Sequence, residues 1–342
     1  MAGMISLSVL DLSPILQGGD AAQSLRNTRD LAQHAERWGY RRFWLAEHHN
    51  LPGVASAATS VVACHVAGHT SKIRVGAGGV MLPNHAPLVI AEQFGTLEAL
   101  FPGRIDLGVG RAPGSDQITA RALRRNLAGD IDQFPQDVIE LMTYFQPPRP
   151  GQVIQAIPGT GLEVPVWILG SSTYGAQLAA ALGLPYAFAS HFAPAQMEEA
   201  IAIYRRDFRP SEYLDKSHLM LGLNVVAAET DASARYLASS TQQMFLNLRA
   251  GRPAPLPPPV ENFEESLDPG AKMLLQQTLA TRIAGSPATF KGALDAFIRR
   301  TGADEVIATS QIYDHAARLR SYEITAQARD ALNAERELEP QP

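Results

Sequence analysis

The residues of this chain that are suited to catalysis or ligand binding follow segments with the pattern of buried strands. Glu47-His48-His49 ends one such segment, and Gly110-Arg111 ends another. A histidine in such a place supplies an acid, a base or a hydrogen-bond donor near neutral pH. An arginine supplies a fixed cation, which suits a phosphate. We therefore expect a ligand site with an anionic part.

A second candidate for holding a phosphate is Gly170-Ser171-Ser172, which lies between a strand pattern at 164–169 and a helix pattern. Backbone N–H groups, hydroxyls and the helix dipole at such a junction form a phosphate cradle. The same hydroxyls also serve as ordinary helix caps. Arg111 favours the phosphate interpretation, but a structural ion pair with Asp106 or Asp116 would also explain this arginine.

The histidines raise the question of a metal site. Adjacent strand residues point to opposite faces, so His48 and His49 cannot readily bind one ion together. His65 and His69 have the i, i+4 spacing of metal ligands on a helix predicted for 56–69. No carboxylate or third ligand follows that helix closely. We expect no metal site, and we interpret His65 and His69 as residues of a packing surface.

The stretch from Arg74 to Gly114 predicts a strand, a helix and a second strand, with glycines in or after both strands. Two parallel strands with a covering helix form a βαβ unit and deliver these glycines to one edge. Backbone without side chains can approach a flat or anionic ligand closely there. No G-x-G-x-x-G follows the first strand, which argues against a Rossmann fold.

Along the chain, eight strand patterns alternate with helix patterns, and no sequence repeat relates them. This count predicts an α/β fold of the (β/α)₈ TIM-barrel type, with insertions after strands four and seven. In such a barrel all the strand-end residues converge on the C-terminal mouth. We expect a single domain over 1–342. The expected strands lie at 5–12, 41–47, 74–81, 105–110, 164–169, 185–190, 219–227 and 306–310.

Composition limits the class of protein. The chain has 342 residues, 46% hydrophobic and 18% charged, which is ordinary for a globular protein. A net charge of −5 offers no basic field for nucleic acid or an anionic membrane. Cys64 is the only cysteine, which excludes an intrachain disulfide. No signal peptide or membrane-spanning pattern is recognised, so a cytoplasmic protein is expected.

Five segments, taken together and in order, resemble the bacterial-luciferase-like flavin monooxygenases, in particular their alkanal-monooxygenase-like branch. They are LAEHHN (45–50), GAGGVMLPNHAP (76–87), LFPGRIDLGVGRAPGSD (100–116), WILGSS (167–172) and LGLPYAFASHF (182–192). The resemblance implies a barrel that binds FMN at its C-terminal mouth, usually as a homodimer. It also implies reduced FMN from a separate flavin reductase, used with O₂ to oxygenate a small organic substrate.

The same resemblance assigns roles to individual residues. The family's histidine of the oxygen chemistry falls on His48, and its non-proline cis peptide beneath the flavin falls on Gly78-Gly79. Its mobile lid after strand seven corresponds to 249–281. Luciferases have a cysteine, an acidic residue and an aromatic residue where this chain has Gly110, Ser171 and Ser190. The implied cofactor-binding residues are Gly78, Gly79, Gly110, Arg111, Gly170, Ser171, Ser172, Gly175 and Ser190.

Three other functions stay open at this point. A deazaflavin (F420)-dependent oxidoreductase would use the same barrel for hydride transfer. A non-catalytic flavin-binding protein would keep the cofactor site without turnover. A metal-dependent barrel hydrolase is the most distant alternative, because it would need a ligand set that the histidine spacings do not supply.

Overall fold

Eight parallel strands form a closed barrel in the computed structural model, which describes residues 4–111, 117–123 and 133–338. The ring is closed by pairing of the first strand with the last and of β6 with β7. The predicted TIM barrel is therefore confirmed. The barrel strands are β1 (Ser6–Asp11), β2 (Arg42–Leu45), β3 (Arg74–Met81), β4 (Ile105–Gly110), β5 (Val166–Gly170), β6 (Tyr186–Phe188), β7 (Leu219–Ala227) and β9 (Glu305–Thr309).

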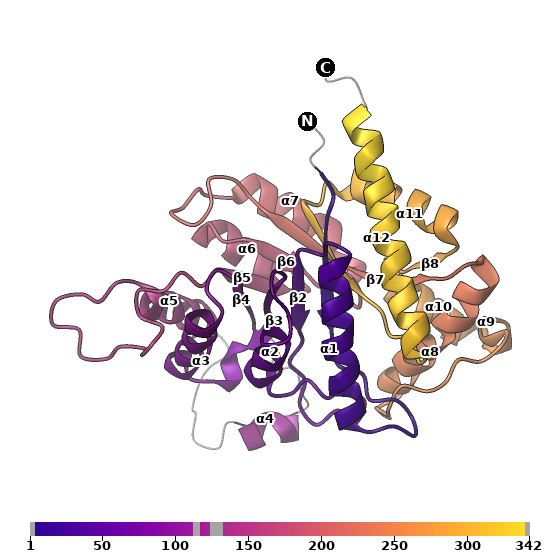
Figure 1. Cartoon of the computed structure of the whole chain (residues 1–342), viewed down its shortest axis with the longest axis horizontal. Coiled ribbons are helices and arrows are strands. Elements are labelled where there is room, and N and C mark those ends of the chain that lie inside the picture. The colour runs from indigo at the N-terminus through magenta and orange to yellow at the C-terminus, as the bar shows by residue number, and fades with distance from the viewer. Residues whose placement is uncertain (1–3, 112–116, 124–132, 339–342) are drawn as a thin grey trace.

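Helices surround this barrel, and both chain ends lie on one side of it, with α4 on the opposite side (Figure 1). The helices are α1 (Ala21–Arg37), α2 (Thr59–Ala67), α3 (Pro87–Leu100), α4 (Gln117–Leu123), α5 (Phe134–Phe145), α6 (Thr173–Leu182), α7 (Met197–Asp207), α8 (Asp231–Arg249), α9 (Phe263–Ser266), α10 (Pro269–Thr278), α11 (Pro287–Thr301) and α12 (His315–Leu338). Two 3₁₀ turns, η1 (Leu82–Asn84) and η3 (Pro194–Gln196), precede α3 and α7.

The structure adds one strand that the sequence patterns do not reveal. β8 (Ile283–Gly285) pairs in parallel with the end of β7, at Val225–Ala227, outside the eight-stranded ring. Three residues are too short for a hydrophobic period to be recognised. α5 follows residues 124–132, which lie outside the described ranges.

Side chains alternate along each strand between the surrounding helices and the barrel lumen. The outward residues pack with the helices into one large apolar core. The inward residues form a smaller apolar layer across the lumen, in which the Trp44 and Trp167 rings meet edge to face with centroids 5.1 Å apart. Members of this layer are Leu10, Trp44, Ala46, Trp167, Ala187, Met220 and Ile307. The layer separates the two ends of the lumen.

A network of buried charges closes the N-terminal end of the lumen. Arg42 donates to Asp106 at 2.7 Å and to Glu305 at 3.1 Å, and both carboxylates are fully buried. Arg74 donates to the other oxygen of Asp106, and Ser8 donates to Glu305. Buried charges are tolerated when they are paired and hydrogen-bonded in this way. We call this set of residues the floor network.

Burial by itself would raise the pKa of Glu305. The hydrogen bond from His218, the charge of Arg42 and the Ser8 hydroxyl outweigh burial and lower this pKa to about 2. The carboxylate is therefore charged at neutral pH and matches the Arg42 guanidinium, whose pKa is raised by Asp106 and Glu305 against the opposing effect of burial.

On this floor side, a cavity of about 660 Å³ opens beside Arg41, Arg74 and His218. It lies away from the C-terminal strand ends, where barrel enzymes place their chemistry.

Glycines let β3 and β4 approach each other closely near the mouth. The register of this pair shifts between Gly78 and Val80, and the Gly78–Gly79 peptide is cis. A Cβ on Gly79 would lie 2.6 Å from the Gly108 carbonyl oxygen, and one on Gly78 would lie 2.8 Å from Leu10. Larger residues at 78 and 79 would therefore clash with the neighbouring strands.

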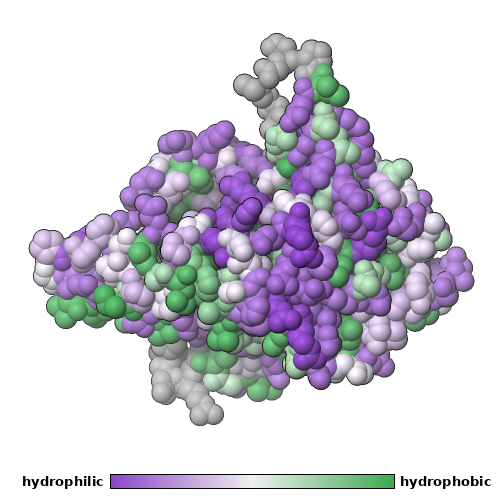
Figure 2. Space-filling model, in the orientation of Figure 1, coloured by the Kyte–Doolittle hydropathy of each residue, from purple (hydrophilic) through white to green (hydrophobic). Residues whose placement is uncertain are grey.

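The surface is largely hydrophilic along α1 in the face shown in Figure 2. This agrees with the amphipathic pattern of that helix, whose buried residues include Thr28, Leu31 and Ala35. Within the described ranges, no helix combines the length and the apolar composition needed to cross a bilayer.

Glu305 should make part of the stability acid-dependent. Because its folded pKa lies below the ordinary value of 4.5, its contribution is present above about pH 4.5 and is lost as the pH falls toward about 2. We expect Glu305→Gln to lower the free energy of unfolding at neutral pH by about 3–5 kcal/mol, because Arg42 stays buried without a full partner. Urea unfolding across this pH range measures both effects, with the exposed Glu261→Gln as control. Equal stability of the two variants would contradict the floor network.

Gly79 should tolerate no side chain, whereas Gly110 should tolerate a methyl group. The Cβ of Gly79→Ala meets backbone at 2.6 Å, but that of Gly110→Ala meets, among the described residues, only Met81 Sδ, at an ordinary 3.5 Å. We expect Gly79→Ala to lower the free energy of unfolding by about 1–3 kcal/mol. Gly110→Ala is the matched control from the paired strand, and its effect should be clearly smaller. Denaturant unfolding of both variants decides the point, and a reversed order would refute this account of the β3–β4 packing.

Candidate functional site

The C-terminal strand ends bring together most of the residues predicted for the site. β3, β4 and β5 are consecutive neighbours in the barrel, and their ends carry Gly78-Gly79, Gly110-Arg111 and Gly170. The cis peptide expected from the resemblance is present between Gly78 and Gly79. We call these three strand ends the glycine arc.

Arg111 extends the glycine arc toward the beginning of α6. Its guanidinium carbon lies 4.0 Å from the centre of the Tyr174 ring, which belongs to the first turn of that helix. This stacking holds the cation beside the Gly170-Ser171-Ser172 loop. An ion pair with Asp106 is wrong as an explanation of Arg111, because Asp106 faces the floor network. Asp116, the other partner considered, lies outside the described residues.

The first turn of α6 is open for an anion. Ser172 is the N-cap residue, and its side chain makes no capping hydrogen bond. Gly170 and Gly175 lie close enough that a Cβ on Gly175 would be 3.4 Å from Gly170 Cα. The Tyr186 hydroxyl donates to the Ser172 carbonyl oxygen at 3.1 Å and holds the Gly170-Ser171-Ser172 loop in place. The backbone N–H groups of this turn thus keep the arrangement of a phosphate cradle.

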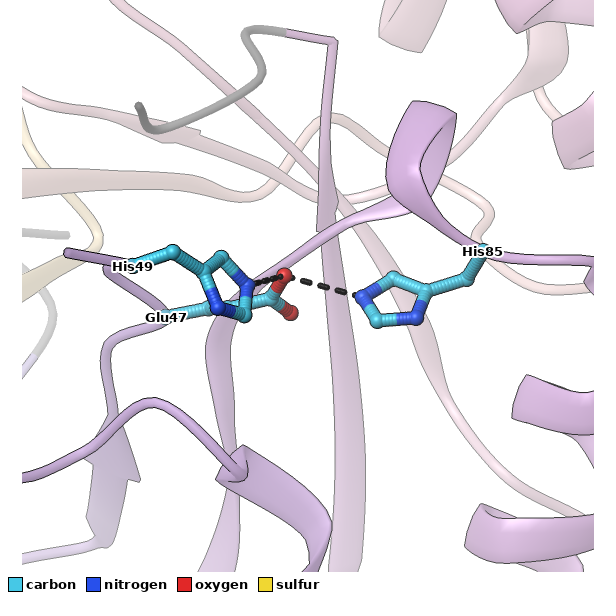
Figure 3. A group of neighbouring side chains, drawn as sticks. All are labelled: Glu47, His49 and His85. Carbon is cyan, nitrogen blue, oxygen red and sulfur yellow. Dashed lines mark hydrogen bonds and ion pairs between the residues drawn. The ribbon is translucent and has the colours of Figure 1, made fainter. Parts of the chain in front are cut away.

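One carboxylate and two histidines point toward one another, with Glu47 between His49 and His85 (Figure 3). Oε1 of Glu47 accepts hydrogen bonds from Nε2 of His49 at 2.8 Å and from Nε2 of His85 at 2.9 Å. The other oxygen accepts the Met81 N–H at 3.2 Å. Burial would raise the pKa of Glu47, but the bonds from His85, His49 and Met81 hold it below its ordinary value. The cluster therefore presents a buried carboxylate that orients two imidazoles.

His85 was not among the site residues predicted from the sequence, although its position after a strand points to the mouth. His85 follows the end of β3 just as His49 follows β2, and these two strands are neighbours. The ligand-capable atoms of Glu47, His49 and His85 lie within 4.8 Å of one another, a set that could hold a metal ion. His48 is not part of this set, as the strand argument predicts.

His48 lies close to a second histidine that the sequence analysis did not single out. The ring of His191, which follows β6, lies against Gly222 on the lumen side of β7. Burial, and to a smaller extent the nearby His48, lower the pKa of His191 to about 4, so its ring is neutral at physiological pH. His48 and His191 therefore follow the two strands, β2 and β6, that flank the glycine arc in the barrel.

Three other residues from the sequence analysis, Ser190, His65 and His69, have surroundings that differ from expectation. The Ser190 hydroxyl is fully buried and donates to the Gly222 carbonyl oxygen at 2.6 Å, so it links β6 to β7. His65 and His69 are both exposed, and the prediction that they form a packing surface is wrong. Their rings contact each other in a tilted arrangement, with centroids 4.6 Å apart and planes at 56°. The buried face of α2 is made instead by small apolar residues such as Val62 and Val66.

Comparison with known proteins gives a family match over most of the chain. The model of the luciferase-like monooxygenases matches residues 5–305. A luciferase-like monooxygenase of Escherichia coli strain K12 is 50% identical over 328 residues, which cover 96% of this chain and 98% of that protein. An N-acetyl-S-alkylcysteine monooxygenase of Bacillus subtilis strain 168 is 38% identical over 256 residues, which cover 73% of this chain and 75% of that protein.

Solved structures show the same relationship. The crystal structure of apo-MsnO8 has a TM-score of 0.84 at 33% identity and covers 98% of this chain and 99% of its own. Two others share only the fold. The oxygenating constituent of a 3,6-diketocamphane monooxygenase in complex with FMN has a TM-score of 0.69 at 15% identity, covering 95% and 97% of the two chains. An F420-dependent secondary alcohol dehydrogenase has 0.67 at 13%, covering 95% and 99%.

This chain has the barrel, the cis peptide at the end of β3 and the histidines after β2. Its alignment with the Escherichia coli relative covers nearly all of both chains. The family model matches residues 5–305, and relatives are up to 50% identical among those compared above; both indicate the same family. This chain belongs to the luciferase-like monooxygenase family.

Proposed function

We propose that this protein is an FMN-dependent monooxygenase that uses reduced flavin from a separate reductase, together with O₂, to oxygenate a small organic substrate. The observation that carries the proposal is the stacking of Arg111 on Tyr174, beside the start of α6, where the N-cap Ser172 side chain makes no capping hydrogen bond. A fixed cation next to unpaired N–H groups is what a phosphate monoester requires. FMN ends in such a group.

The described residues fit the rest of the cofactor as well. The glycine arc offers backbone without side chains at Gly79 and Gly110, where a flat ring system can lie close to the strands. Among the described residues, Met81 Sδ is the one atom that would approach a Cβ at Gly110 within 4 Å. Bound FMN in its reduced form would supply the electrons for activating O₂.

The protein residues would bind, orient and move protons. Arg111, Ser171 and Ser172 hold the phosphate, and the glycine arc supports the ring. His48, whose charge acts on the His191 ring, is the acid or base that we assign to the reacting part of the site. Glu47 orients His49 and His85 at the edge of the mouth, so that their Nε2 atoms carry protons toward its carboxylate.

The proposal extends to a lid, to partners and to location. Residues 249–281 include α9 and α10 and pack against α8 beside the mouth, where a lid would exclude water. The loop after α5 exposes Val153, Ile154 and Ile157, which supports a protein contact there, with a second copy in a homodimer. We further propose that a flavin reductase binds this protein transiently and that the protein is cytoplasmic.

Two rival functions use the same fold, and binding measurements separate them. An F420-dependent oxidoreductase would bind F420 more tightly than FMN. A non-catalytic flavin-binding protein would bind FMN and show no turnover with any trial substrate. Because one relative is an N-acetyl-S-alkylcysteine monooxygenase, a thioether of that class is the first substrate to test with reduced FMN in air. Preferred binding of F420, or no binding of FMN, would overturn the proposal.

Arg111 should contribute to binding FMN through its phosphate alone. We expect Arg111→Ala to weaken FMN binding about tenfold to a hundredfold, because one charge-assisted hydrogen bond is worth about 1.5–3 kcal/mol. Riboflavin, which lacks the phosphate, should bind both proteins equally. Quenching of flavin fluorescence measures the two dissociation constants. The control is Arg206→Ala on α7, where the arginine pairs with Asp207 at the surface. An equal loss for riboflavin would place Arg111 elsewhere in the site.

His48 should act on turnover and not on flavin affinity. We expect His48→Ala to lower the rate of substrate oxygenation about a hundredfold or more, since positioned acids and bases contribute about 10²–10⁴-fold. The dissociation constant of FMN should change little in the same variant. His65→Ala is the matched control, because that histidine is exposed on α2. The measurement is product formation with reduced FMN supplied by a reductase, and an unchanged rate would exclude His48 as the acid or base.

A further inference from the structure

The cavity on the floor side of the barrel has no part in the proposed function. Its volume of about 660 Å³ lies within the range of small-molecule sites in proteins, about 300–1,000 Å³. The starts of β2, β3 and β5, and the residues just before β6 and β7, contribute to its lining. A molecule in this cavity would therefore lie at the end of the barrel opposite the glycine arc. We call it the floor cavity.

The walls of the floor cavity are largely apolar and partly aromatic. Phe145 and Trp167 are buried, with 7% and 3% of their surfaces exposed. The Trp167 ring meets the His218 ring nearly at a right angle, with centroids 5.3 Å apart. Pockets of this kind bind the apolar body of a ligand and use a few polar groups to orient it. Other apolar residues of the lining are Met142, Leu162, Pro165, Pro185 and Leu214.

Two loops border the floor cavity and are joined to each other. Residues 146–163 lead toward β5, and residues 208–218 lead from α7 to β7. The Gln146 side-chain amide donates to the Tyr213 hydroxyl at 2.7 Å, and both residues line the cavity. Within the second loop, the Ser211 N–H donates to the Leu214 carbonyl oxygen at 3.0 Å. These bonds hold both loops in the shape that bounds the cavity.

Three guanidinium groups reach the floor cavity from the floor network. Arg42 and Arg74 donate to Asp106, and Arg42 also donates to Glu305. The Arg41 side chain is half exposed and lies 3.9 Å from a Glu305 oxygen, which is too far for a hydrogen bond. Three cations thus face two buried carboxylates. The charge left without a full partner among the described residues is that of Arg41.

The other titratable residues of the lining do not cancel this charge. Glu163 and Glu212 are exposed, where water and salt screen their fields. Burial and the charge of Glu212 raise the pKa of Tyr213, so its hydroxyl is neutral. His218 is already bonded to Glu305 through Nε2, at 3.3 Å. The inner end of the cavity therefore favours one negative charge, and the two exposed glutamates disfavour a polyanion.

We propose that the floor cavity is a second ligand site, which binds a small monocarboxylate with a flat apolar body. The Arg41 guanidinium donates two hydrogen bonds to the carboxylate, because its planar fork matches that group. The apolar body contacts Phe145 and the neighbouring apolar residues of the wall. This site does not depend on the proposed function, because it uses no residue of the glycine arc or of the first turn of α6.

Calorimetric titration of the full chain with cinnamate, cinnamamide and cinnamylammonium tests the site. We expect the wild type to bind cinnamate at least about tenfold more tightly than either analogue at neutral pH. Arg41→Gln should weaken cinnamate binding at least about tenfold and leave cinnamamide binding unchanged, because only the carboxylate uses the charge. Equal affinity for the three compounds, or unchanged cinnamate affinity in Arg41→Gln, would overturn the proposal.

Two further variants locate the bound molecule. The mouth could also take a flat anion, so Arg111→Ala is the matched control at the opposite end of the barrel. Its affinity for cinnamate should equal that of the wild type, and a loss would place cinnamate in the mouth and overturn the proposal. Leu214→Trp should fill the cavity. Cinnamate should then raise the thermal midpoint of the wild type but not that of this variant, and an equal rise in both would refute the site.

Binding of FMN, measured on the same preparations, separates this proposal from the proposed function. If cinnamate binding depends on Arg41 while FMN does not bind, the monooxygenase proposal fails and the second site stands. If FMN binds while Arg41→Gln leaves cinnamate affinity unchanged, the second site fails and the monooxygenase proposal stands.

Discussion

The arrangement of the mouth depends on the floor network at the other end of the barrel. Arg42 joins Asp106 on β4 to Glu305 on β9, and Ser8 of β1 binds the same glutamate. These charges are buried, so any shift of one strand along its neighbour would leave a charge unpaired, at a cost of several kcal/mol. The network therefore fixes strand register. The residues that follow each strand by a set number of positions then meet at the mouth.

Above the floor, the barrel divides into two arcs of different chemistry. On β3 and β4 the lumen side is made largely of glycine, at Gly76, Gly78, Gly108 and Gly110, whereas β5 contributes Trp167 and Leu169. On β6, β7 and β9 the lumen side carries polar side chains, including Asn224 and Thr309. The apolar layer below both arcs closes the lumen toward the floor.

The histidines show how strongly surroundings decide what one residue type does. Two of them bind the carboxylate of Glu47, whose pKa is lowered despite its burial. His191 is buried without a carboxylate, and its pKa is depressed instead. His218 belongs to the floor network and helps to hold the pKa of Glu305 at about 2. The same imidazole group thus serves as a hydrogen-bond donor, a neutral ring and part of an ion network.

The sequence by itself determined the fold class, the eight barrel strands and the strand ends that carry Arg111 and Ser171-Ser172. These features follow from local patterns: buried strands alternate with amphipathic helices, and glycines or small polar residues end them. Only the tertiary structure decided which distant residues meet. In the fold, His85 binds Glu47, and Asp106 binds Arg42 on the floor side and not Arg111. The buried polar atoms of His191, Thr309 and Gln311 come from the residues after β6 and from the end of β9. Contacts of this kind depend on barrel closure and strand register, which local periodicity does not encode.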